Sequence, residues 1–291
     1  MNLYYAMGGG LGHLTRAVAF LRGLVIENDS IILSSSPFLT DKRVVGNIRT
    51  ILVEKSLEID RSEYQKYLQN LFAEIKPQKI FIDSFPIGII GEFVGFEFDE
   101  SVEINYLARH LRWKNYSALI DAELPRFDKT FLLENLENEH LNFVETVSQQ
   151  IIAFDLTYPA PDLSPKDFEI YQSILDTKFP FWLIVHSGEE SEISELVEFA
   201  AEMREIEAVE TNLILISPTE FSTTIKNFFQ FDIYPASVLF QKAERIFSAA
   251  GFNVMKQTEP FKDKHFFIPF ERRFDNQFWR AKIKRESLNK A

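Results

Sequence analysis

The chain has 291 residues, no cysteine and a hydrophobic fraction of 46%. This length suffices for two α/β domains of about 150 residues each. The lack of cysteine excludes disulfides, zinc–thiolate clusters and thiol chemistry. A net charge of −12 argues against a nucleic-acid backbone binder but allows a phosphate ligand held by backbone N–H groups. With no long apolar run and no signal pattern at the N-terminus, we expect a cytoplasmic protein.

In the first half, strand-like and helix-like runs alternate, which is typical of a parallel sheet covered by helices. Strands are predicted at residues 3–7, 30–34, 48–53, 79–83 and 105–107, and helices at 12–24 and 62–75. The segment 127–143 is rich in charge and leucine and is predicted to be a helix or lid.

A linker is predicted at Tyr158-Pro159-Ala160-Pro161-Asp162, because closely spaced prolines disfavour helix and central strand. The alternation then restarts with strands at 181–186, 212–216, 243–247 and 265–269 and helices at 192–205 and 274–286. We therefore predict two Rossmann-like α/β domains, residues 1–155 and 156–291, with the last helix as the segment that could cross back to the first domain.

The first candidate site is the glycine-rich run from Gly8 to Arg16, between the first strand and the first helix. Gly10 and Gly12 allow close backbone approach by a ligand, and the helix N-terminus favours anions. The spacing does not fit the dinucleotide-binding pattern. His13 in this turn is the candidate general base, with a pKa that we expect the helix N-terminus to lower. Arg16 could hold phosphate or serve structure alone.

The second candidate site combines a small-residue loop with the start of the last helix. Ser248, Gly251, Phe252 and Asn253 follow a predicted strand, in a loop suited to close backbone contact. Asn276 and Gln277 offer amides that could bind a hydroxyl-rich ligand. Taken singly, each of these residues could equally be a cap or a turn residue.

Together these motifs resemble the inverting glycosyltransferases of the GT-B fold, in which two Rossmann-like domains face each other across a cleft. The likeness is to the family 28-like branch, which contains the lipid-linked N-acetylglucosaminyltransferase of peptidoglycan synthesis. It is carried by Gly9-Gly10-Leu11-Gly12-His13, by Phe247 to Asn253, and by Pro269-Phe270 followed by Asp275, Gln277 and Ala281. Ser187 and Gly188 look like a loop that such enzymes place near the pyrophosphate. Gln257 stands where the family carries a ribose-binding glutamate.

The resemblance implies transfer of a hexosyl or N-acetylhexosaminyl group from a nucleoside-diphosphate donor, with UDP-sugars expected first. His13 would deprotonate the acceptor hydroxyl, and the reaction would need neither a metal nor a cofactor. Because Gln257 replaces the ribose-binding glutamate of the family, the identity of the nucleotide stays open. Hydrolysis of a nucleotide-sugar, as in a related short enzyme of nonulosonic acid biosynthesis, and non-catalytic binding remain alternatives.

A basic C-terminal segment raises the further expectation of peripheral contact with the inner face of a membrane. It comprises Arg272, Arg273, Arg280, Lys282, Lys284 and Arg285. A solvated face of the last helix is the other interpretation.

Overall fold

The computed structural model describes residues 1–121, 123–160, 162–177 and 179–288; Pro161 of the predicted linker lies outside them. The chain divides into two compact units, each described by itself. Unit 1 comprises Met1–Pro159 together with Arg273–Asn276, and unit 2 comprises Ala160–Arg272 and Gln277–Ala291. The short segment Arg273–Asn276 therefore groups with unit 1, whereas the last helix groups with unit 2.

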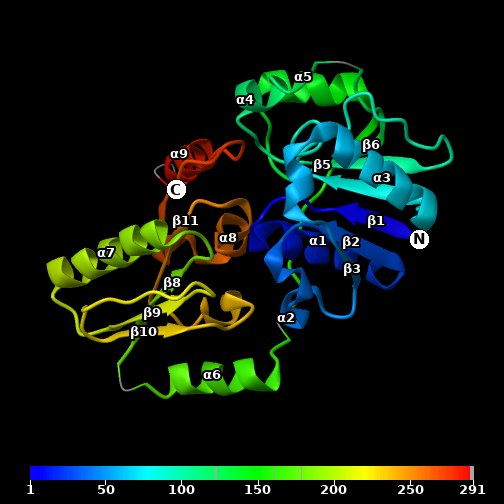
Figure 1. Cartoon of the computed structure of the whole chain (residues 1–291). Coiled ribbons are helices and arrows are strands. Elements are labelled where there is room, and N and C mark those ends of the chain that lie inside the picture. Colours follow the sequence, from blue (N-terminus) through cyan, green and yellow to red (C-terminus); the bar gives the residue numbers. More distant parts are fainter. Residues whose placement is uncertain (122, 161, 178, 289–291) are drawn as a thin grey trace. The chain divides into compact units, whose positions relative to one another are not determined.

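Unit 1 is built on seven parallel strands in the order β3-β2-β1-β4-β5-β6-β7 (Figure 1). The strands are β1 (Asn2–Tyr5), β2 (Ser30–Ser34), β3 (Arg49–Leu52), β4 (Lys79–Asp83), β5 (Glu103–Ala108), β6 (Phe127–Leu132) and β7 (Ser148–Ala153). The helices are α1 (Leu11–Gly23), α2 (Lys42–Val45), α3 (Arg61–Ile75), α4 (Trp113–Ser117) and α5 (Asn138–Val147). Parallel neighbours require crossover connections, and helices supply most of them.

Both faces of this sheet are covered, since successive side chains of a strand point to opposite faces. Tyr4 of β1 packs against Phe20 of α1, with 5.9 Å between ring centroids. Its neighbour Tyr5 packs on the other face, where its hydroxyl bonds to Tyr64 of α3 at 2.8 Å. Strands buried on both faces must be apolar throughout, which explains the near-continuous hydrophobic runs in the sequence.

Unit 2 has a five-stranded parallel sheet in the order β10-β9-β8-β11-β12. Its strands are β8 (Phe181–Val185), β9 (Asn212–Ile216), β10 (Phe228–Phe231), β11 (Arg245–Ala249) and β12 (His265–Ile268). Its helices are α6 (Pro165–Leu175), α7 (Glu190–Glu207), α8 (Phe252–Gln257) and α9 (Gln277–Leu288). Buried residues of α7 cover one face of the sheet, and Ile174 of α6 packs on the other. No helix in the described ranges is long and apolar enough to cross a membrane.

The prediction of a helix or lid over 127–143 is wrong. Residues 127–132 form β6, which lies between β5 and β7, and the helix α5 begins only at Asn138. Charged residues in β6 hide the pattern of a buried strand, yet the fold gives these charges partners. Asp128 accepts the backbone N–H of Ile104 at 2.8 Å, and Lys129 bonds to Glu103 at 2.8 Å.

Candidate functional site

The glycine loop after β1 places His13 at the carboxyl edge of the unit 1 sheet. Helix α1 begins at Leu11 with Gly10 as its N-cap, so His13 is the third helical residue. Gly9 and Gly10 in the loop are exposed, and so is Gly12 in the first turn of the helix. Open α/β sheets bind their ligands at this carboxyl edge.

His13 forms a hydrogen-bonded pair with Asp83, the last residue of the neighbouring strand β4. Its Nδ1 lies 2.6 Å from Asp83 Oδ2. Arg16, one turn further along α1, bonds the same carboxylate through Nε and Nη2, both at 2.6 Å. Burial raises the pKa of Asp83, but Arg16 and His13 outweigh it and hold that pKa well below its usual value. The carboxylate is therefore ionised.

Two contacts of Nδ1 bear on the tautomer of His13. Nδ1 lies 2.6 Å from the Asp83 carboxylate, which can only accept, and 3.0 Å from Arg16 Nη2, which can only donate. We assign the Nδ1 proton to the shorter contact with the ionised carboxylate, which leaves the lone pair of the neutral ring on Nε2. No residue in the described part of the chain hydrogen-bonds Nε2. The side chain is 14% exposed. Burial, more than any other influence, lowers the pKa of His13, although Asp83 opposes it. An oriented imidazole of this kind can accept a proton from a bound hydroxyl group near neutral pH.

Gly8 backs the imidazole from the other side. Its φ of +127° suits glycine, and a Cβ at this position would lie 2.7 Å from His13 Nε2. By contrast, a Cβ at Gly9 would meet nothing within 4 Å, and one at Gly10 would have its nearest neighbour at 3.9 Å. The fold thus needs Gly8 to seat His13, whereas the next two glycines leave the backbone open.

Two further residues extend the His13–Asp83 pair. Ser84 Oγ accepts hydrogen bonds from Arg16 Nη2 at 2.9 Å and from Arg109 Nε at 2.7 Å. The other end of the Arg109 guanidinium pairs with Asp275 of the segment Arg273–Asn276. The cluster therefore consists of two arginine–aspartate pairs, joined through the Ser84 hydroxyl, at the carboxyl edge of unit 1.

In unit 2, the loop after β11 leaves its backbone accessible. Gly251 is the N-cap of α8 with φ −71°, and a Cβ there would have only Val254 within 4 Å, at 3.9 Å. The fold does not require this glycine, and its lack of a side chain leaves the backbone open to close approach by a ligand. Asn253 and Gln257 lie half-buried on α8. Phe252 is buried, as is Ser248, whose hydroxyl bonds to the Ala249 carbonyl at 2.9 Å and lies 2.8 Å from His265.

The loop after β8 carries a second histidine–carboxylate pair. His186 Nε2 lies 2.7 Å from Glu192 Oε2, and Arg272 Nη2 bonds that same oxygen at 2.6 Å. Burial raises the pKa of Glu192, but its bonds to His186 and Arg272 prevail and bring the pKa to about 2. A Cβ on Gly188 would lie 2.4 Å from His186 Nε2, so this glycine seats the pair. Ser187 beside it is half-buried.

The amides that the sequence singled out fall in different units. Asn276 groups with unit 1, where its Nδ2 lies 3.3 Å from His110 Nε2. Gln277 is buried at the start of α9, and its Oε1 accepts the backbone N–H of Phe270 at 3.0 Å. The oxygen of Gln277 is therefore used to fix the chain after β12.

Much of the basic charge near the C-terminus is compensated within unit 2. Arg280 bonds the Ala250 carbonyl at 3.0 Å, Lys284 pairs with Glu259, and Lys282 lies 3.9 Å from Glu286. Arg285 lies over the Phe267 ring, at 5.4 Å from its centroid. These contacts favour a structural role for this basic segment.

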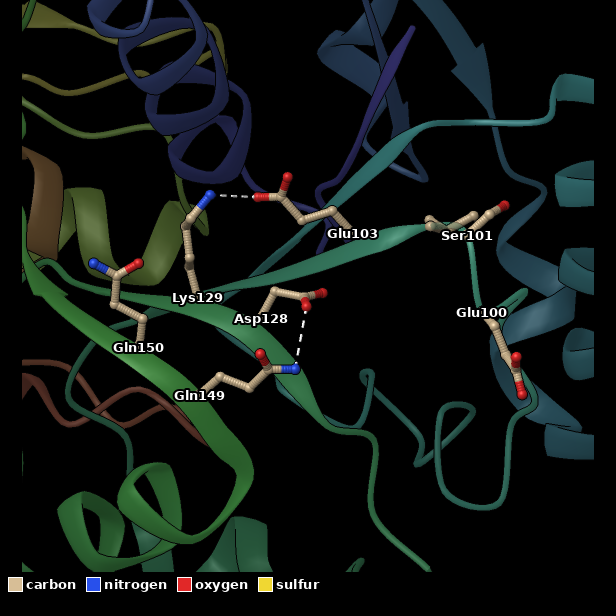
Figure 2. A pocket seen from close by; sticks show the side chains of 8 residues that line it. Glu100, Ser101, Glu103, Asp128, Lys129, Gln149 and Gln150 are labelled. Atoms are coloured by element: carbon tan, nitrogen blue, oxygen red, sulfur yellow. Dashed lines mark hydrogen bonds and ion pairs between the residues drawn. The ribbon is translucent and has the colours of Figure 1, made fainter.

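A polar groove of about 560 Å³ lies on unit 1, lined by the residues just before β5 and by the starts of β5, β6 and β7. Figure 2 shows the side chains that line it. The groove lies at the amino edge of the sheet, opposite His13. Its polar groups bond to one another: Lys129 to Glu103 at 2.8 Å, and Gln149 to Asp128 at 3.3 Å. We therefore place the candidate site at the carboxyl edge. In the ranges that the structure describes, no three histidine, aspartate or glutamate side chains are grouped as ligands for a metal ion.

Asp83, Arg109 and Asp275 escaped the sequence analysis as site residues. The run Asp83-Ser84-Phe85-Pro86 is conspicuous in the sequence, yet nothing local assigns it a partner. Asp83 does carry one usable signal, because a charged residue that ends a buried strand lies at the carboxyl edge. Arg109 follows β5 in the same way.

Comparison with known proteins shows the fold. No family model and no curated protein matches the chain. Among solved structures, it is similar to the S. aureus MnaA–UDP co-structure, with a TM-score of 0.60 and 11% identity over 93% of this chain and 79% of that one. For the UDP-GlcNAc 2-epimerase from Neisseria meningitidis bound to UDP-GlcNAc, the TM-score is 0.61 and the identity 9%, over 97% of this chain and 85% of that one. For the Streptomyces sp. SF2575 glycosyltransferase SsfS6, the TM-score is 0.53 and the identity 10%, over 98% of this chain and 85% of that one. The predicted GT-B-type α/β fold is confirmed, and the family 28-like branch stays a prediction.

Proposed function

We propose that this protein is an enzyme that binds a nucleotide-activated sugar and transfers the sugar to an acceptor hydroxyl group, with His13 as general base. The observation that carries the proposal is the 2.6 Å bond between His13 Nδ1 and Asp83 at the carboxyl edge of unit 1, which leaves Nε2 as the basic atom. Fold similarity to glycosyltransferases and to UDP-sugar epimerases supports this substrate class.

The proposed reaction proceeds as follows. Nε2 of His13 takes the proton of the acceptor hydroxyl, whose oxygen attacks the anomeric carbon as the bond to the diphosphate oxygen breaks. The nucleoside diphosphate leaves with the electron pair, and the configuration inverts. Asp83 stabilises the imidazolium that forms, as a buried carboxylate does for other catalytic histidines.

The donor would bind through the exposed backbone of the glycine loops. In unit 2, Ser187, Gly188 and the loop from Gly251 to Asn253 would meet the diphosphate with backbone N–H groups, so that no metal is needed. Gln257 would bond the ribose. UDP is the first nucleotide to test, because two of the similar structures hold UDP or UDP-GlcNAc.

Three other reactions or roles are distinguishable by their products. Water in place of the acceptor would give hydrolysis, and a protein without turnover would be a nucleotide-sugar-binding subunit. The similarity to 2-epimerase structures, at TM-scores of 0.60 and 0.61, makes epimerisation the second candidate. Epimerisation would change the sugar without using an acceptor.

The test is product analysis by NMR and mass spectrometry on UDP-sugars, with and without a panel of hydroxyl acceptors. We expect acceptor-dependent release of UDP, and a loss of rate of about 10²–10⁴ in His13→Ala with donor affinity retained. Thr15→Ala, on the same helix turn, is the control. Full activity in His13→Ala would remove the assigned base. UDP release without an acceptor, or a sugar epimer with intact donor, would replace transfer by hydrolysis or epimerisation.

A further inference from the structure

Asp275 occupies an unusual place in the sequence for a residue of unit 1. It belongs to the segment Arg273–Asn276, which follows the last strand of unit 2 yet groups with unit 1. Its neighbours fix it there. Arg112 donates its backbone N–H to the Phe274 carbonyl at 2.7 Å, and Asp275 forms a backbone bridge with Leu111.

Phe274 anchors the segment in the core of unit 1. Its side chain is buried, with ring centroids 5.8 Å from Phe85 and 5.1 Å from Tyr116. Phe85 in turn lies 5.6 Å from the His13 ring. The segment that carries Asp275 is therefore packed against the same aromatic cluster that contacts the imidazole of His13.

Charge balance gives Asp275 its role. Arg16 and Arg109 are 3% and 5% exposed, and both donate to the hydroxyl group of Ser84. A buried guanidinium is costly unless a carboxylate compensates it. Asp83 compensates Arg16, and Asp275 compensates Arg109. The Ser84 hydroxyl that Arg109 contacts donates to Asp83 Oδ1 at 3.3 Å, so it joins the Arg109–Asp275 pair to the carboxylate that holds His13.

We propose that Asp275 is a positioning residue, which through Arg109 and Ser84 holds the Asp83 carboxylate in the orientation that accepts the Nδ1 proton of His13. The proposal concerns the orientation of His13; its consequence for turnover rests on the proposed function. Ser84 is well suited to this link, since its φ of +67° turns its backbone directly after β4.

The charged and polar groups that surround His13 determine how its pKa responds to the loss of Asp275. Asp83 at the end of β4 raises its pKa, while Arg16 on α1 and Arg109 after β5 lower it. Tyr4 of β1 lies below, with its hydroxyl 3.3 Å from Asp83 Oδ1. Removing the charge of Asp275 leaves Arg109 uncompensated and loosens Asp83. Both effects lower the pKa of His13 further and weaken the preference for the Nδ1-protonated tautomer.

The test compares wild type with Asp275→Asn, which keeps the size of the side chain and removes its charge. Long-range ¹H–¹⁵N NMR spectra of the imidazoles report the pKa and tautomer of His13, which is assigned by its loss in His13→Gln. We expect a lower pKa and a mixed tautomer in Asp275→Asn, and a fall in turnover of about 10- to 100-fold, the usual range for a group that orients a reactive one. Asp121→Asn is the matched control, because Asp121 pairs with Arg61 at 2.9 Å on the surface of the same unit.

A folded Asp275→Asn protein in which His13 titrates with the wild-type pKa and tautomer would overturn the proposal. If that variant does not fold, Arg109→Lys keeps the positive charge and loses the forked contact; an unchanged His13 in it would be equally decisive. Absence of turnover on any nucleotide-sugar in wild type would remove the proposed function alone, since the NMR comparison needs no substrate.

Discussion

Replacing Gly8 by alanine should disable His13 while leaving the fold in place. A Cβ at Gly8 would lie 2.7 Å from His13 Nε2 and 2.8 Å from its Cδ2. This is short of an ordinary contact by about 0.7 Å, so the ring must move by a similar amount. A shift of that size would disturb the Nδ1–Asp83 bond, now 2.6 Å, because a hydrogen bond of this kind tolerates only a few tenths of an ångström.

The cost should divide between stability and rate. An alanine at a φ of +127° is strained by about 1–3 kcal/mol, which a domain of this size tolerates. Turnover should fall by about 10²–10⁴, the contribution of a well-placed general base. Gly9→Ala is the matched control, because a Cβ there meets nothing within 4 Å.

The assay is steady-state turnover of the donor, accompanied by urea unfolding of both variants. Wild-type turnover in Gly8→Ala would refute the argument that this glycine seats the base. An equal loss in Gly9→Ala would show that the loop backbone, rather than contact with His13, is what both changes disturb.

Three other predictions follow from the same structure. Gly188→Ala should displace His186, which a Cβ would approach to 2.4 Å, and should weaken nucleotide binding measured by calorimetry; unchanged affinity would contradict a donor role for this loop. Gly251→Val should weaken nucleotide binding without loss of stability, since the fold leaves room at this position, and unfolding of the variant would show a structural role instead. Acid should destabilise both units, because burial lowers the pKa of His140 and His265 from 6.5 to about 3, so the unfolded chain binds more protons as pH falls through this range. The free energy of unfolding measured with urea should fall by about 2 kcal/mol per histidine between pH 7 and pH 5. A free energy that stays constant over this pH range would exclude the effect.

Much of the fold could be predicted from the sequence, because its strands are continuous apolar runs and its long helices are periodic. β2 and β4 were predicted with the bounds that the structure gives, and α1 and α3 to within one residue. β6 was missed because the charged residues Asp128 and Lys129 interrupt the apolar run expected of a buried strand. β7 was missed because it is an edge strand, largely exposed, without the apolar pattern of a buried strand.

The candidate site was predictable only where its residues are neighbours in sequence. Gly8, Gly10 and His13 form one local motif. Asp83, however, lies 70 positions from His13, and the order of the strands alone brings them together. The expected direction of the His13 pKa shift is confirmed, and burial is a large influence on it that the sequence analysis does not include. Burial depends on tertiary packing, which a single sequence does not reveal.

The most direct measurement is the thermal unfolding of wild type against UDP, GDP, TDP and CMP and their sugar conjugates. The account predicts that one nucleotide class raises the unfolding temperature progressively with concentration, by about 2.7 kcal/mol of added stability at 100 times its dissociation constant. His13→Ala should respond equally, since it loses catalysis rather than binding. If no nucleotide or nucleotide-sugar stabilises the folded protein at millimolar concentration, the proposed substrate class is wrong.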